Sequence, residues 1–233
     1  ICLKEKSKYY QISVDSIVKT VEKIVFERAQ NFWLGVHEDE IDSNVLHALI
    51  SEDVISQQGQ YVRLKYDVFE DICFEHHFDL TFDYCKGDYQ TFYKDIEGLG
   101  RCVYRRYQIW ISNKLFIKTN RERFVFTLIF SNDIPDAWKM QTIIGIVKSK
   151  YCDEFFEENG SNIFDNGLLP EIINITNVYA FEAKLANDDA VLLNPVGNGR
   201  PSLIKLISNN AYYKDYYLKD KGWVKHSQPR KDN

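Results

Sequence analysis

The sequence predicts a mainly α-helical protein in which a winged-helix unit with a short β-hairpin precedes an α-helical array. Three observations predict this fold class. Apolar residues recur at helical spacing over most of the 233 residues, while residues 61–66 alternate with the period of a half-buried strand. This strand pattern lies between two helical patterns within residues 42–78. Helix, hairpin and helix in this order form the back half of a winged-helix fold.

The first expected helix belongs to the same unit. Ser13 or Asp15 can cap its first turn with a side-chain oxygen. One apolar stripe at helical spacing follows, formed by Ile17, Val18, Val21, Ile24, Val25, Ala29 and Trp33. We therefore expect this helix to be the first helix of the winged-helix unit.

The second expected helix and the hairpin follow directly. Asp42 can cap a helix whose apolar face is Val45, Leu46, Leu49 and Ile50. Residues 57–60 supply a turn, and Val62, Leu64 and Tyr66 then alternate with Tyr61, Arg63 and Lys65. Asp67 is expected to end the strand and cap the next helix, with Glu70 three residues later, as in a capping box.

Helices are expected through most of the remaining chain. One long helix should run from residue 88 to about Phe116, with Gly98 and Gly100 inside it. Each glycine costs about 1 kcal/mol against alanine in a helix interior. Either a neighbour packs closely there or the helix bends.

Residues 121–130 are apolar and aromatic, and we interpret them as a helix because their neighbours are helical. Pro135 starts another helix that should continue to about Glu158, where residues 159–162 break it. Shorter helices are expected at 168–176, 178–186 and, after a loop, 202–208. The predicted domains are a winged-helix domain at 1–82 and a helical scaffold domain at 83–233.

Composition narrows the setting of the protein. No run approaches the 18 apolar residues of a membrane span, so no membrane partner is expected. Five scattered cysteines fit a reducing, cytoplasmic location better than a disulfide framework. The start of the chain lacks both an initiator Met and a signal-peptide pattern. We therefore expect this chain to be part of a longer protein.

Charge argues against DNA recognition by the winged-helix unit. Residues 1–80 carry 8 Lys and Arg against 15 Asp and Glu, a net charge of −7. A helix that reads DNA lies against phosphates and normally carries Lys or Arg. The helix in the recognition position has Asp42, Glu52 and Asp53 around it and no basic residue. A nucleic-acid-binding winged-helix regulator therefore stays only as an alternative.

The basic and aromatic stretch at 101–107 has two interpretations. Its charges and rings could bind nucleic acid by attraction and stacking. We favour a different role, in which Arg101, Arg105 and Arg106 are interdomain contacts that pair with the neighbouring acidic unit.

No residue is assigned a catalytic or metal-binding role. The chain has no G-x-x-x-x-G-K-[ST] phosphate loop. The pattern from Cys73 through His76 and His77 to Cys85 is better explained by a core cysteine than by a zinc site. Pro170-Glu171 with Glu182 and Lys184 is similar to a magnesium-dependent nuclease pattern, which stays a less favoured alternative.

The order of elements resembles the region that follows the nucleotide-binding core of bacterial STAND NTPases, relatives of the NACHT and NB-ARC switch proteins. The resemblance is carried by residues 49–55, by the junction at 62–69, by the helix at 101–115 and by residues 193–199. These patterns together touch much of the chain, and each is loose.

The resemblance implies a regulatory role for this chain. In that family a His-Asp pair at the strand–helix junction senses the β-phosphate of ADP. Tyr66 and Asp67 occupy the matching positions here. Tyrosine is neutral and longer than histidine, so direct contact with nucleotide is in question.

The resemblance also implies partners outside this chain. They are an upstream ATPase core that uses ATP or ADP with Mg²⁺, a downstream sensor region and an effector domain. The chain alone would be no enzyme. The parent protein would form homo-oligomers when it senses a ligand, as in antiviral defence.

Overall fold

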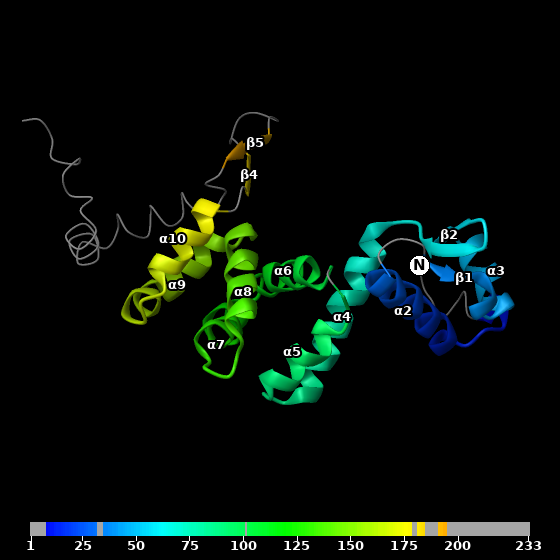
Figure 1. Cartoon of the computed structure of the whole chain (residues 1–233), viewed down its shortest axis with the longest axis horizontal. Coiled ribbons are helices and arrows are strands. Elements are labelled where there is room, and N and C mark those ends of the chain that lie inside the picture. The colour runs from blue at the N-terminus through cyan, green and yellow to red at the C-terminus, as the bar shows by residue number, and fades with distance from the viewer. Residues whose placement is uncertain (1–7, 32–34, 101, 179–180, 185–190, 195–233) are drawn as a thin grey trace, which may run out of the picture. The chain divides into compact units, whose positions relative to one another are not determined.

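The structure, a computed structural model, describes residues 8–31, 35–100, 102–178, 181–184 and 191–194 (Figure 1). It is mainly helical, with a small three-stranded antiparallel sheet near the N-terminal helices, which confirms the predicted fold class. The chain divides into two compact units. The first comprises residues 1–110 and 133–135, and the second comprises residues 111–132 and 136–233.

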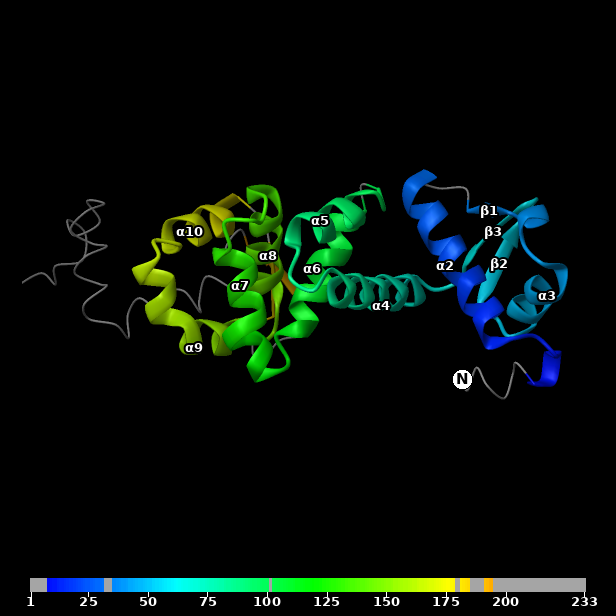
Figure 2. The same ribbon diagram turned by 90° about the horizontal axis from the view of Figure 1, so that it is seen from below.

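The first unit contains the winged-helix arrangement. Its elements are α2 (Val14–Asn31), β1 (Val36–His37), the 3-10 turn η1 (Glu38–Glu40), α3 (Ser43–Ser51), β2 (Ile55–Gln58) and β3 (Tyr61–Leu64). The strands pair antiparallel in the order β1-β3-β2, with Val36 opposite Val62 and Ile55 opposite Leu64. Helix α2 packs along β3, and α3 lies beside β2 (Figure 2). The two-residue strand β1 was not predicted, because it is too short to show an alternating pattern.

Both predicted caps at the start of the unit are confirmed. The hydroxyl of Ser13 accepts a hydrogen bond from the Ser16 amide at 3.0 Å. One carboxylate oxygen of Asp42 accepts from the amides of Asn44 at 2.9 Å and Val45 at 3.1 Å. Each interaction satisfies amides that have no partner inside the helix.

The hairpin turn is shorter than predicted. Gln57 and Gln58 lie in β2, so Gly59 and Gln60 alone connect the strands, and Gly59 adopts a φ of +64°. Val62 and Leu64 are buried, which confirms the alternation on β3. The strand ends at Leu64, and the Tyr66 side chain is 46% exposed, which corrects its predicted place on the buried face.

Helix α4 (Asp67–Cys85) begins differently from the prediction. Its N-cap residue is Tyr66, which makes no side-chain capping bond, and Asp67 is the first helical residue. The predicted capping by Asp67 is therefore wrong. Glu70 points elsewhere because it pairs with arginines from two other helices.

The long helix predicted up to residue 116 is two helices, α5 (Tyr89–Glu97) and α6 (Val103–Lys114). Gly100, with a φ of +92°, separates them. A Cβ on Gly100 would lie 2.6 Å from the carbonyl oxygen of Ala29 on α2. Both expected explanations therefore hold, because the helix is interrupted and a neighbour packs against the glycine.

An aromatic core joins α4, α5 and α6 within the first unit. Its buried members are Phe74, Phe78, Phe92, Tyr93, Tyr107 and Trp110. The hydroxyls of Tyr93 and Tyr107 share a hydrogen bond at 2.8 Å, and the Trp110 indole donates to Asp79 at 2.8 Å. The domain boundary predicted at 82 and 83 falls inside α4, and the first compact unit continues to Trp110.

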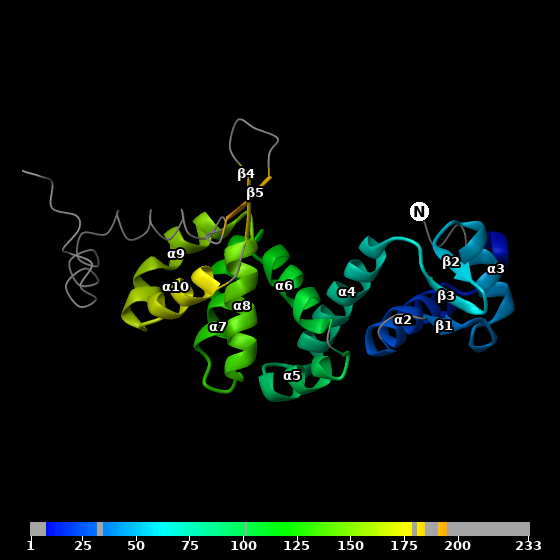
Figure 3. The same ribbon diagram turned by 45° about the horizontal axis from the view of Figure 1, so that its top comes forward.

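The second unit is a set of helices packed on α8 (Asp136–Lys148). The other elements are the π-helical turn η2 (Asn120–Phe124), α7 (Val125–Phe130), α9 (Cys152–Asp165), α10 (Leu169–Val178), β4 (Phe181–Lys184) and β5 (Val191–Asn194). Helices α7, α9 and α10 each contact α8 (Figure 3). The helices predicted at 121–130 and 168–176 are confirmed, the first with a π-helical start.

Two other predictions in this unit are wrong. The predicted helix is interrupted at residues 149–151, between α8 and α9, and α9 continues through residues 159–162. Asn159 does not end the helix because its buried amide donates to the carbonyls of Phe155 at 3.0 Å and Arg121 at 3.3 Å. Residues 181–184 form a strand paired antiparallel with β5, in place of the expected helix at 178–186. The expected helix at 202–208 lies outside the described residues.

Candidate functional site

The predicted nucleotide-sensing junction lies between β3 and α4 of the first unit. The hydroxyl of Tyr66 donates a hydrogen bond to Asp53 at 3.1 Å, and the ammonium group of Lys65 pairs with the same carboxylate. Asp53 follows α3 with a φ of +61°. The hydrogen bond from Lys65 is the main cause that lowers the pKa of Asp53. The junction is therefore tied to the end of α3 by an ionised carboxylate.

Asp67 has a different environment from its neighbour. Its side chain is 79% exposed, and its carboxylate lies 3.9 Å from the guanidinium of Arg28 on α2. The structure thus places Tyr66 and Asp67 at the surface of one junction, with separate partners inside the unit. Their role toward nucleotide stays a prediction.

A cluster of four charged side chains lies behind this junction. Glu70 on α4 is buried and pairs with Arg28 from α2 and, at 2.8 Å, with Arg106 from α6. Arg106 also pairs with Asp71. The guanidinium of Arg106 lies 5.6 Å from the centre of the Phe74 ring, within range of a cation–π contact. These ion pairs connect α2, α4 and α6, three helices that are far apart in the sequence.

The three arginines predicted as interdomain contacts differ in what the structure shows of them. Arg106 pairs with the acidic helix α4. Arg105 is exposed and forms no ion pair with the part of the chain that the structure describes. Arg101 lies outside the described residues. Contact with another domain stays a prediction for all three.

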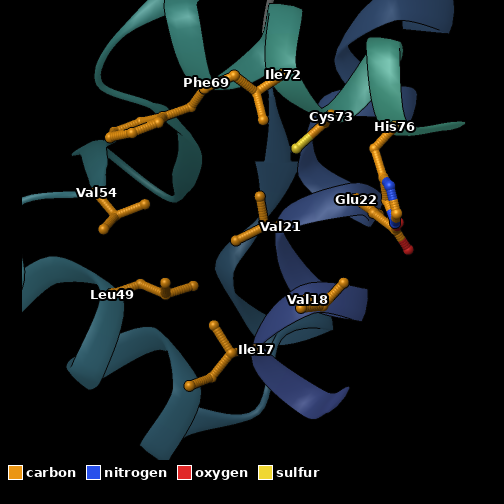
Figure 4. A pocket seen from close by; sticks show the side chains of 10 residues that line it. All are labelled: Ile17, Val18, Val21, Glu22, Leu49, Val54, Phe69, Ile72, Cys73 and His76. Atoms are coloured by element: carbon orange, nitrogen blue, oxygen red, sulfur yellow. The ribbon is translucent and has the colours of Figure 1, made fainter. Parts of the chain in front are cut away.

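An apolar groove opens between α2, α3 and α4, beside the junction (Figure 4). Its volume is about 550 Å³. The apolar side chains that line it include Ile17, Val21, Leu49, Val54, Phe69 and Ile72. Glu22, Cys73 and His76 stand at one end of it (Figure 4).

The groove was not predicted from the sequence. Its α2 residues belong to the predicted apolar stripe, so they were expected to be covered by the core. Its α4 residues Phe69, Ile72 and Cys73 likewise fit one apolar stripe of a helix. No local signal in the sequence therefore distinguishes a groove from a covered core here.

The thiol and imidazole groups near the groove are not arranged for catalysis or metal binding. Burial raises the pKa of the Cys73 thiol to about 11, with the nearby carboxylates of Glu22 and Glu70 adding to the shift. A thiol with this pKa is a poor nucleophile. Burial also lowers the pKa of His77. No group of three or more His, Cys, Asp and Glu side chains suited to a metal occurs among the described residues.

The face that would read DNA in a winged helix has no basic side chain on its helix. The sequence of α3 is SNVLHALIS, and Asp42, Glu52 and Asp53 flank it. Lys65, near the end of this helix, is paired with Asp53. The geometry therefore gives phosphates no cluster of cations at α3.

The residues of the nuclease alternative lie on two kinds of element. Pro170 and Glu171 are in helix α10, while Glu182 and Lys184 are in strand β4. Residues 172–175, which follow Glu171 directly, are also helical. The structure thus has one strand for this pattern, and the alternative stays a prediction.

In the second unit, the buried Arg121 forms an ion pair with Glu158. Arg121 in the π-helical turn donates to both carboxylate oxygens of Glu158 on α9, at 2.8 and 2.9 Å. The same guanidinium donates to the carbonyl of Leu115 at 2.7 Å. The hydrogen bonds from Arg121 are the main cause that lowers the pKa of Glu158. This pair fixes the π-helical turn against α9, so its role is structural.

Comparison with other proteins adds no family. Within the described residues, no helix combines the length and the apolar character needed to cross a bilayer. No family model matches the chain, and no curated protein matches it either.

Proposed function

We propose that this chain is a regulatory and scaffold part of a STAND-type signalling NTPase in cytoplasmic antiviral defence. In this role the winged-helix unit docks against an ATPase core of the same protein. It relays rearrangements that depend on nucleotide or ligand between that core and a downstream sensor. ATP or ADP with Mg²⁺ would bind to the core, and the chain alone would carry no catalytic residue.

The observation that carries this proposal is the character of the winged-helix unit. Its recognition-position helix α3 has no Lys or Arg, and the neighbouring surface is an apolar groove. Apolar grooves are typical of surfaces that bind other proteins. Tyr66 and Asp67, which are exposed, occupy the positions that the resemblance to STAND NTPases assigns to nucleotide contact.

A switch of this kind needs an element that docks in two arrangements, each favoured by a different ligand. The ion pairs of Glu70 with Arg28 and Arg106 connect α2, α4 and α6. Through them the winged-helix unit can move as one body, so that a change at the junction reaches α6.

The test is a binding measurement between this chain and the segment encoded upstream of Ile1 in the parent protein. We expect a phosphate-binding loop in that segment and tighter association with ADP than with ATP. Tyr66→Ala should weaken the association, while Tyr84→Ala, which removes an 81% exposed tyrosine from α4, should not. The proposal would be refuted by an upstream segment that lacks the loop, or by an association that is equally tight with ADP and with ATP.

The nucleic-acid and nuclease alternatives predict different results. A DNA-binding regulator would bind duplex DNA with an affinity that falls as salt increases. A magnesium-dependent nuclease would cleave DNA and lose this activity in Glu182→Ala. Neither result is expected from a docking unit.

A further inference from the structure

The groove between α2, α3 and α4 leaves a large apolar side chain exposed. Ile72 on its α4 wall is 56% exposed, and it lines the groove together with the apolar residues Val21, Leu49 and Phe69 (Figure 4). Because this large apolar side chain is exposed beside a cavity of about 550 Å³, covering it with another apolar group would be favourable.

The lining of the groove favours a helix over a small molecule. Sites for small molecules combine apolar walls with several convergent polar groups. Here the polar side chains are confined to one end, where Glu22 and His76 stand (Figure 4). The walls are themselves three helices, and a fourth amphipathic helix can place side chains at i, i+3, i+4 and i+7 between them.

The charges around the groove select the sign of the partner. Helix α4 has six Asp and Glu residues and no Lys or Arg, and three of these carboxylates (Asp67, Glu70 and Asp71) are already paired with Arg28 or Arg106. Two cations on α2 and at the β3–α4 junction are already paired, Lys19 with Asp15 at 2.8 Å and Lys65 with Asp53. Glu22, on the groove wall, forms no ion pair with any described residue. A partner with Lys or Arg beside its apolar face would pair with it.

We infer that the groove binds an amphipathic helix of a separate partner protein, with an apolar face edged by Lys and Arg. Ile72 and Phe69 contact the apolar face, and Glu22 pairs with a cation at its edge. This inference rests on the groove alone and holds whether or not the chain belongs to a nucleotide switch.

The test uses the 233-residue chain and two labelled helical peptides in a fluorescence anisotropy titration. Both peptides have the same leucine face, and the edge positions are Lys in one and Glu in the other. We expect saturable binding of the Lys-edged peptide and clearly weaker binding of the Glu-edged peptide. Equal binding of the two peptides, or no binding of either, would overturn the inference.

Two matched variants locate the site. Ile72→Asp should weaken binding of the Lys-edged peptide about tenfold or more, because it places a carboxylate at the centre of the groove. Leu80→Asp is the control, since Leu80 lies on the same helix, is 54% exposed and does not line the groove. Far-UV circular dichroism is used to check that both variants are folded. Equal losses in the two variants would mean adsorption to exposed apolar surface and would overturn the inference.

The charge contact has its own readout. Glu22→Lys should weaken binding of the Lys-edged peptide and strengthen binding of the Glu-edged peptide, each by a factor of about two to five. Sedimentation velocity completes the test. If the chain dimerises and Ile72→Asp abolishes the dimer, the groove is covered by a second copy, and the inference of a separate partner fails.

Discussion

At the scale of single residues, the main lesson concerns carboxylates whose partners are distant in the sequence. Glu70 fits a capping box by its spacing from Asp67, yet it pairs with Arg28 and Arg106, 42 and 36 residues away. Local spacing indicates what a side chain can do within its own helix. It contains no information on arginines that other helices bring close, so this cluster could not be predicted.

Replacing Glu70 tests the importance of the cluster. Glu70→Gln should lower the free energy of unfolding by about 3 kcal/mol, because it leaves two arginines without their shared carboxylate in a partly buried site. Urea unfolding followed by circular dichroism measures this loss. Asp83→Asn, an exposed position on the same helix, should change stability by less than about 0.5 kcal/mol. Similar values for the two variants would contradict the role of the cluster.

The pair of Arg121 and Glu158 gives a dependence of stability on pH. The pKa of Glu158 is lowered in the folded protein from its ordinary value of 4.5. The unfolded state therefore binds the proton more readily. The stability that this pair contributes is complete above about pH 4.5 and is lost as the pH falls through the lowered pKa. In the Glu158→Gln variant, the unfolding temperature should fall less between neutral and acid pH than it does in the unchanged protein. An unchanged difference between neutral and acid pH would refute the assignment.

At the scale of elements, a helix boundary could be predicted where interactions within one turn of the helix determine it. The caps at Ser13 and Asp42 were predicted correctly, since a cap acts within one turn. The break expected at residues 159–162 was wrong, because the Asn159 amide binds carbonyls inside the protein. The helix expected at 178–186 was also wrong, because four residues are too few to show the alternation of a strand and the pairing of β4 with β5 decides their conformation.

Two glycines with nearly the same backbone conformation separate strain from packing. Gly100 has a φ of +92° and Gly87 a φ of +93°, but only Gly100 has a neighbour, the Ala29 carbonyl, where a Cβ would lie. Gly87→Ala should cost about 1 kcal/mol from backbone strain alone. Gly100→Ala should cost at least about 1 kcal/mol more, since the chain must also move away from α2. Equal losses in urea unfolding would mean that α2 does not pack closely on this connection.

At the scale of the whole molecule, the order of elements was predictable and the surface was not. Periodicity and turn residues predicted a winged-helix unit before a set of helices, and the structure confirms both. The groove depends on how α2, α3 and α4 leave Ile72 uncovered. Such a gap is a property of three packed helices together, and no single segment of sequence encodes it.

The central claim is that the acidic winged-helix unit binds protein and does not read DNA. It is tested most directly by titrating the chain into a labelled DNA duplex at low salt and measuring fluorescence anisotropy. Non-specific DNA-binding proteins bind duplex DNA with dissociation constants of about 1 to 100 μM at physiological salt, and they bind more tightly at low salt. We predict no change in anisotropy when this chain is added over the same range of concentrations. A saturable increase that weakens steeply as salt is added would contradict the claim.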